Sequence, residues 1–120
     1  MARYTCSLTV AIPLEQLQSA FIEILKSCNF RDIYTTTDFI MASEKPGDVN
    51  YRKLVTAEVF IHRSTATESE VNVSVEVKNE ELALHLDNHC FQMFNVVQEA
   101  IYADNSLQLI KLVDRNYHSF

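Results

Sequence analysis

Hydrophobic and polar residues alternate along the start of the chain, between positions 3 and 12. One side of this segment is apolar and the other is polar: Tyr4, Cys6, Leu8, Val10 and Ile12 against Arg3, Thr5, Ser7 and Thr9. A period of two predicts a half-buried β-strand. After Pro13 the apolar spacing changes to three and four residues, with Leu14, Leu17, Phe21, Ile24, Leu25 and Cys28 on one side. This spacing predicts an amphipathic helix of about four turns.

Residues 29–44 are rich in threonine, β-branched and aromatic side chains. This composition favours two short strands, separated by a polar corner at 35–38. The following segment, 44–51, combines Pro, Gly, Asp and Asn and predicts a loop. We expect Gly47, the single glycine of the chain, to supply a positive φ angle in that loop.

The clearest alternation lies in the middle of the chain, in residues 55–62 and 71–78. The polar segment 63–69 separates these two runs, so they predict an antiparallel hairpin with one apolar face and one mixed face. The mixed face of the hairpin carries Thr56, Glu58, Phe60, His62, Asn72, Ser74, Glu76 and Lys78.

The segment 79–86 fits either a strand or the start of a helix, and its pattern leaves both open. Asp87 is a suitable N-cap for a second amphipathic helix that extends to Ile101. Beyond a break at Asp104 and Asn105, the tail contains further apolar residues. These residues either extend the second helix along the sheet or form a partner-binding segment.

The expected element order is therefore β-α-β-β-β-β-α, which indicates an α+β fold of two layers. We expect a five-stranded, mostly antiparallel sheet with both helices on its apolar face, and the other face open. Residues 1–105 form the domain, and residues 106–120 form an extension that packs on it or faces a partner. The element order resembles TATA-binding-protein-like and helix-grip topologies, and this likeness of order carries no ligand or DNA role.

Charge and composition narrow the classes of partner. The 120 residues contain 10 Lys and Arg against 16 Asp and Glu, a formal net charge of −6. This charge opposes nucleic-acid binding, which depends on neutralising phosphates. We expect no signal peptide and no membrane span, because polar residues interrupt the first strand and no apolar run approaches 20 residues. The three cysteines have no motif spacing, which suggests buried thiols in the cytoplasm.

Three stretches resemble a small family of cyanobacterial proteins that has no assigned function. They are Phe39–Gly47 (FIMASEKPG), Lys53–Val59 (KLVTAEV) and Val77–Cys90 (VKNEELALHLDNHC). The resemblance extends from Tyr4 to about Asp104. It implies a cytoplasmic bacterial protein and brings no catalytic residue with it.

Candidate chemistry in the chain is sparse. A single glycine excludes phosphate-binding loops and nucleophile elbows, which need several. His85 and His89 are spaced as half of a metal site, but Asp87 as a cap would place His85 before the helix. Asp87, His89 and Cys90 cannot form a catalytic relay at their spacing on one helix. We therefore expect a non-enzymatic protein without a cofactor.

Three segments are candidates for partner binding. Phe60 and His62 are the anchors on the open sheet face, because aromatic groups dominate interface energies. The 45–52 loop offers Tyr51 and Arg52, and the tail offers Leu107 and Ile110. The sequence thus predicts a cytoplasmic protein-binding or assembly module, with a second copy of the chain as one candidate partner. The alternative is a small-ligand or metal-binding module of helix-grip type, with His85 and His89 as metal ligands.

Overall fold

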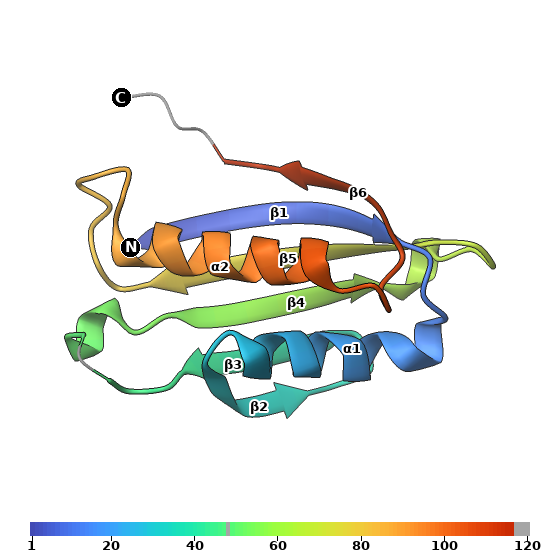
Figure 1. The fold of residues 1–120 in the computed structure, drawn as a ribbon, viewed down its shortest axis with the longest axis horizontal. Helices are drawn as coiled ribbons and strands as arrows, with labels where there is room; N and C mark the ends of the chain where they lie inside the picture. The colour runs from blue at the N-terminus through green and yellow to red at the C-terminus, as the bar shows by residue number, and fades with distance from the viewer. Residues whose placement is uncertain (48, 117–120) are drawn as a thin grey trace.

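The computed structural model describes residues 1–47 and 49–116, which form a sheet with two α-helices on one of its faces (Figure 1). The described elements are β1 (Ala2–Val10), α1 (Leu14–Ser27), β2 (Phe30–Thr35), β3 (Phe39–Glu44), the 3₁₀ turn η1 (Tyr51–Lys53), β4 (Thr56–His62), the 3₁₀ turn η2 (Arg63–Thr65), β5 (Val71–Asn79), α2 (His89–Ala103) and β6 (Leu109–Asp114). The strand order is β2-β3-β4-β5-β1-β6, and all neighbours are antiparallel. The predicted α+β class is confirmed.

Both helices pack on the apolar face of the sheet, and the opposite face carries no helix in the described part of the chain (Figure 1). Helix α1 contacts β2 and β3, whereas α2 contacts β1 and β5. Phe21 of α1 and Phe94 of α2 are fully buried between the layers. The alternating valines of β5 are buried beneath them, as the period of two requires (Val71, Val73, Val75 and Val77).

The tail differs from the expectation. Residues 109–114 form the edge strand β6, which pairs with β1, so the described sheet has six strands rather than five. The expected continuation of the second helix is wrong, because Asp104 ends α2 and its Oδ1 accepts hydrogen bonds from Ser106 and Leu107 backbone amides. Residues 117–120 of the predicted extension lie outside the described residues.

The start of α2 also differs from the expectation by one residue. Asn88, not Asp87, is the N-cap, and its Oδ1 accepts a 2.9 Å hydrogen bond from the Phe91 amide. Asn88 is buried, and its Nδ2 donates to the Tyr4 hydroxyl and to the His85 carbonyl at 2.7 Å each. The amide can therefore serve the cap and the core together, which the acceptor-only carboxylate of Asp87 could not.

Gly47 does not have the expected positive φ angle. The positive φ angles among the described residues belong to Asn29, Asp32 and Gln108, each next to the end or the irregular part of a strand. A Cβ added at Gly47 would meet nothing within 4 Å. The loop at 45–52 therefore does not depend on glycine at this position.

Neither described helix combines the length and the apolar composition that crossing a membrane requires. They contain 14 and 15 residues, and each buries one side against the sheet.

Candidate functional site

The open face of the sheet combines a polar centre with an apolar corner. In the centre, Glu58 and Glu76 lie directly opposite each other on β4 and β5. Each of these carboxylates is paired with a cation at 2.9 Å, Glu58 with Lys78 and Glu76 with Arg3. Two like charges in a cross-strand pair repel, so the two cations are what allow this arrangement.

The apolar corner lies over β2, β3 and β4. Strand pairing places Phe39 opposite Phe60 and Tyr34 opposite Met41, and all four residues share the open face. The Phe39 and Phe60 rings are tilted against each other with centroids 5.0 Å apart. Tyr34, Met41 and Phe60 are exposed, by 56%, 37% and 38%. We call these four residues the aromatic patch.

Phe60 was predicted from its isolated aromatic character, but its three companions were missed. The alternation of β3 puts Phe39 and Met41 on one face, and this signal was present in the sequence. The pairing of Tyr34 with Met41 could not be predicted from the sequence, because the strand register is irregular between Arg31 and Tyr34. Aromatic pairs of this kind are favourable beyond their buried area, by about 0.5–1.5 kcal/mol.

His62 lies at the end of the same strand, exposed, with Nε2 2.8 Å from Ser74 Oγ. Next to it, Arg63 Nε pairs with Asp38 Oδ1 at 3.1 Å, which adds a charged rim beside the aromatic patch. The structure therefore brings Phe60 and His62 together on one surface, as predicted. An apolar centre with a polar rim is the usual organisation of a protein interface.

Tyr51 and Arg52 lie in η1, before the start of β4, whereas Phe60 and His62 lie at the end of that strand. Tyr51 and Arg52 are both exposed, and the relative exposure of Tyr51 is 75%. Arg52 lines a cleft of about 750 Å³ between η1, the 80–88 segment and the start of α2. These two residues therefore belong to a different surface from the aromatic patch. Residue 48 of the predicted loop lies outside the described residues.

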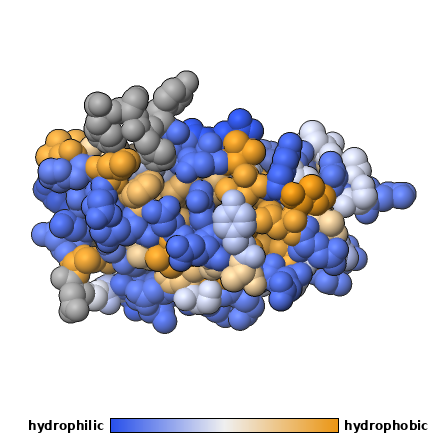
Figure 2. Space-filling view, turned by 45° about the horizontal axis from the view of Figure 1, so that its top comes forward, coloured by the Kyte–Doolittle hydropathy of each residue, from blue (hydrophilic) through white to orange (hydrophobic). Residues whose placement is uncertain are grey.

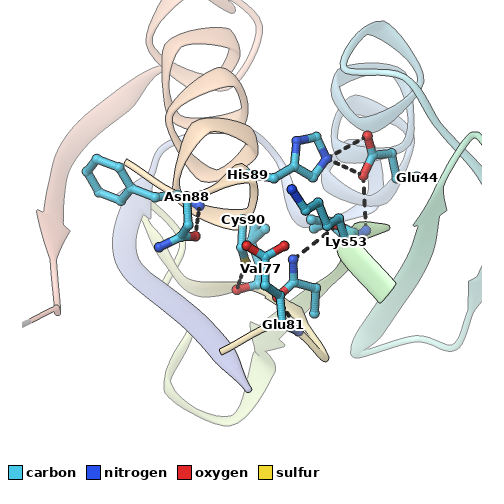
Figure 3. Close-up of polar contacts among 10 residues, drawn as sticks. Glu44, Lys53, Val77, Glu81, Asn88, His89 and Cys90 are labelled. Atoms are coloured by element: carbon cyan, nitrogen blue, oxygen red, sulfur yellow. Dashed lines mark hydrogen bonds and ion pairs between the residues drawn. The ribbon is translucent and has the colours of Figure 1, made fainter. Parts of the chain in front are cut away.

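At the inner edge of this cleft, the side chains of Glu44 of β3 and His89 of α2 form a hydrogen-bonded pair (Figure 3). His89 Nε2 lies 2.9 Å from Oε1 and 3.0 Å from Oε2 of Glu44. Glu44 Oε1 also accepts a 3.0 Å hydrogen bond from the Val55 amide. Because an ionised carboxylate only accepts, His89 Nε2 carries the proton in this pair. The sequence offered no signal for this contact between distant segments.

The arrangement of the two histidines does not match the metal hypothesis. His85 precedes α2 and offers its carbonyl to Asn88, while His89 is paired with Glu44. Among residues 1–47 and 49–116, no three His, Cys, Asp or Glu side chains gather in a way that could hold a metal ion. A metal site at His85 and His89 would have to form from a different arrangement of these side chains.

The three cysteines are buried free thiols. Burial raises the pKa of Cys6 to about 12. The pKa of Cys90 is also raised to about 12, mainly by burial and to a smaller extent by the negative charges of Glu81 and Glu44. Burial also raises the pKa of Cys28. A thiol with a raised pKa is a poor nucleophile, because the reactive species is the thiolate. The thiols act as small apolar core residues.

The two tail candidates have opposite environments. Leu107 is fully buried in the core, so its assignment to a partner surface is corrected: burial removes its side chain from any such contact. Ile110 is 52% exposed on β6, the outermost strand beside β1. After α2 the chain turns back toward the sheet, so Leu107 is buried in the core whereas Ile110 lies exposed on the edge strand.

Comparisons with known proteins leave the chain without a family. No family model and no curated protein matches it. Among solved structures, it is similar to a conserved protein from Geobacillus kaustophilus, at 13% identity and a TM-score of 0.34. That match covers 84% of this chain and 96% of the other.

Proposed function

We propose that this chain is a non-enzymatic protein-binding module that holds a partner protein on the open face of its sheet. The aromatic patch is the observation that carries the proposal: Tyr34, Met41 and Phe60 lie exposed on a face that is otherwise largely polar, and the Phe60 ring packs at a tilt against the half-buried Phe39. Aromatic residues and methionine are enriched at interfaces, and exposed apolar clusters of this kind mark interaction sites. The partner would insert an apolar side chain between Met41 and Phe60.

Charge adds a second property of the partner. The chain carries a formal net charge of −6, so association with a basic protein surface is faster and with an acidic one slower. Residues Lys111 and Val113 of β6 share the open face, because they pair with Thr9 and Ser7. The C-terminal strand therefore widens the proposed binding surface beyond the patch. Three unpaired thiols agree with a reducing compartment, and we place the protein in the cytoplasm.

A capture experiment followed by a measurement on purified proteins tests the proposal. The tagged chain is used to recover a partner, which is then purified and titrated against the wild type by calorimetry. Phe60→Ser is expected to weaken binding at least about tenfold, the effect typical of an interface anchor. Val96→Ser, which changes a residue of α2 with 43% exposure, is the matched control and should leave affinity unchanged. Equal affinity of the Phe60→Ser protein would refute the assignment, provided that its circular dichroism melt is intact.

A small-ligand module is the second candidate, and one observation favours it. Glu81 lines the 750 Å³ cleft, and its buried Oε2 has no hydrogen-bond partner among the described residues. A buried carboxylate oxygen without a donor is costly, and a ligand amine or hydroxyl would satisfy it. The space between sheet and helices, where the helix-grip analogy places a ligand, is instead filled by side chains such as Phe21 and Phe94.

Native mass spectrometry of the protein purified from its own source tests this second function. A co-purified small molecule bearing an amine or hydroxyl should be present in the wild type and lost in Glu81→Gln. A bare protein mass in both would remove the cleft from consideration.

A further inference from the structure

The open face of the sheet has a small hollow where β5, β1 and β6 lie side by side. Its volume is about 270 Å³, and its lining comes from these strands together with His62 of β4 and Arg115, which follows β6. No Asp or Glu belongs to this lining within the described part of the chain. In a chain with a formal net charge of −6, the absence of carboxylates sets the hollow apart from the rest of the surface.

Strand pairing arranges the polar side chains of the hollow in two rows across the face. In the first row, Asn72 of β5 lies opposite Thr9 of β1, and Thr9 lies opposite Lys111 of β6. In the second row, Ser74 of β5 lies opposite Ser7 of β1. Directly paired residues project from the same face of a sheet. The hollow therefore gathers hydroxyl, amide and ammonium groups, all of which can donate hydrogen bonds.

Two cations border the hollow, Lys111 and Arg115. Neither of them forms an ion pair with another described residue. By contrast, Arg3 and Lys78 on the same face each hold a carboxylate at 2.9 Å. Arginine and lysine side chains both carry their charge at neutral pH. The hollow thus has two positive charges available to a ligand.

The neighbouring carboxylates are directed elsewhere. Asp114 precedes Arg115 in the chain, but it pairs with the buried Cys6 and so projects from the helix side of the sheet. Glu76 lies on the open face, and Arg3 holds its carboxylate at 2.9 Å. The positive charge of the hollow is therefore not cancelled by these two nearby acids.

Hydrogen bonds within the hollow hold its donor groups in place. Arg115 Nε donates to Ser7 Oγ at 3.2 Å, which leaves the terminal amino groups of the guanidinium for another partner. The backbone of Arg115 is also held, because its amide donates to the Thr5 carbonyl at 3.0 Å. Thr9 Oγ1 donates to Asn72 Oδ1 at 2.8 Å, so the Asn72 side chain offers its amino group to a ligand. The donors are therefore positioned before any ligand arrives.

We propose that this hollow binds a phosphate group, either as inorganic phosphate or as part of a small phosphate ester. A guanidinium matches phosphate in shape, because two of its N–H groups can bond two phosphate oxygens. A phosphate ester carries a charge of about −1.5 to −2 at pH 7, which the two cations balance. Pockets that enclose a whole ligand usually measure about 300–1,000 Å³. The smaller hollow therefore suits one phosphate group rather than an entire nucleotide.

The phosphate site is separate from nucleic-acid binding and from the proposed protein interface. Nucleic-acid affinity depends on neutralising many phosphates along a backbone, whereas the hollow offers two cations. The aromatic patch lies over β2 to β4 and contributes none of its four residues to the lining. The phosphate site therefore does not rest on the proposed function, and Phe60→Ser should leave phosphate binding intact.

A nuclear magnetic resonance titration with inorganic phosphate at constant ionic strength tests the site. The wild type should show saturable shifts of the Thr9, Lys111 and Arg115 amides below about 10 mM phosphate. Lys111→Gln and Arg115→Gln should each weaken binding about tenfold, because each removes a charge-assisted hydrogen bond. Lys26→Gln removes the same charge from an exposed position of α1 and should bind like the wild type. Shifts that never saturate, or that both hollow variants leave unchanged, would overturn the proposal.

Asn72→Asp tests the charge of the hollow without altering β6. It adds a negative charge but keeps the acceptor for the Thr9 hydroxyl, so phosphate binding should fall at least about tenfold. Gln16→Glu adds the same charge to α1, on the helix side of the molecule, and should leave binding unchanged. Figure 2 shows this side, with the β6 edge turned forward, as a mainly hydrophilic surface with separate hydrophobic areas. Full phosphate binding by a folded Asn72→Asp protein would refute the site.

Two further ligands identify the source of the phosphate group and test the ligand class. Tighter binding of glycerol phosphate than of inorganic phosphate would assign the hollow to a phosphate ester. The reverse order would assign it to free phosphate, and either order supports the site. Acetate, which carries a single charge, should bind at least about tenfold more weakly at the same ionic strength. Acetate and phosphate affinities that are equal would overturn the assignment to phosphate.

Discussion

Glu44 at the end of β3 and His89 at the start of α2 are joined by a side-chain hydrogen bond, although they are 45 positions apart in the chain. The pair has side-chain exposures of 6% and 16%, and the carboxylate also holds the Val55 amide at 3.0 Å. It thereby connects the second helix to the two strands that flank η1. This contact has consequences for stability.

Glu44→Ala is expected to destabilise the protein by about 3 kcal/mol, because it leaves the partly buried His89 imidazole and the buried Val55 amide without their acceptor. Glu44→Gln keeps an oxygen for the Val55 amide and should cost less. Glu23→Ala is the control, since Glu23 is exposed and its ion pair with Lys26 is long, at 4.0 Å. Urea unfolding gives the three values. Equal loss for Glu44→Ala and Glu23→Ala would contradict a structural role for the pair.

Asn88→Ala is expected to destabilise the protein by about 2 kcal/mol, the upper end of the range for an N-cap. The reason is that Asn88 also donates to the Tyr4 hydroxyl and the His85 carbonyl. Asp87→Ala removes only an exposed contact to Gln92 and should change stability by less than about 0.5 kcal/mol. Thermal unfolding of both variants distinguishes the two caps. The reverse order would restore Asp87 as the cap.

Leu107→Ala is expected to cost about 3 kcal/mol, as for other fully buried leucines, because it leaves a cavity beneath the start of β6. Ile110→Ala, three residues away and half exposed, should stay within about 0.5 kcal/mol. Chemical denaturation measures the free energy of unfolding of both variants. Similar small effects would show that the tail is not part of the folded domain.

Alkaline pH should reduce stability through the buried thiols. Burial raises the pKa of Cys90 from 9.0 to about 12, so above pH 9 the unfolded chain loses this proton while the native chain keeps it. The stabilisation is complete below pH 9 and declines as the pH rises toward 12, by at most about 1.4 kcal/mol per pH unit.

Urea unfolding of the wild type and of Cys90→Ala, between about pH 8 and pH 10, measures this contribution. Tyrosines and lysines titrate in both proteins, so the difference in slope isolates the thiol. The variant should decline less steeply. Parallel curves would mean that the Cys90 thiol ionises equally in both states.

Sequence reasoning located the helices and the strands of the centre because each has its own period. Alternation in residues 71–78 and three-and-four spacing after Pro13 both follow from burying one side of an element. The same reasoning identified Phe60 and His62 as neighbours on the open face. Sequence reasoning missed β6, because the apolar residues in 107–113 do not follow a regular period. A bulge at Thr9 and Val10 of β1 accommodates this irregular spacing where the two strands pair.

The candidate sites show the same division. Phe39 and Met41 could be assigned to the open face from their alternation, whereas the contact of Tyr34 with Met41 depends on a register shift in β2. In the sequence, Glu44 resembles an ordinary carboxylate at the edge of a loop. Only the folded structure shows that α2 places His89 against it. A local pattern cannot report a contact of this kind, since its free energy comes from two segments that meet only after folding.

The amino-acid sequence by itself determined which side of each element is buried, the α+β class and the placement of both helices on one face. Those properties follow from periodicity and from the free energy of removing apolar surface from water. Tertiary structure alone decided the sixth strand, the burial of Leu107, the Asn88 cap and the Glu44–His89 pair. Each of these depends on strand register or on the meeting of distant segments, which no local alternation encodes.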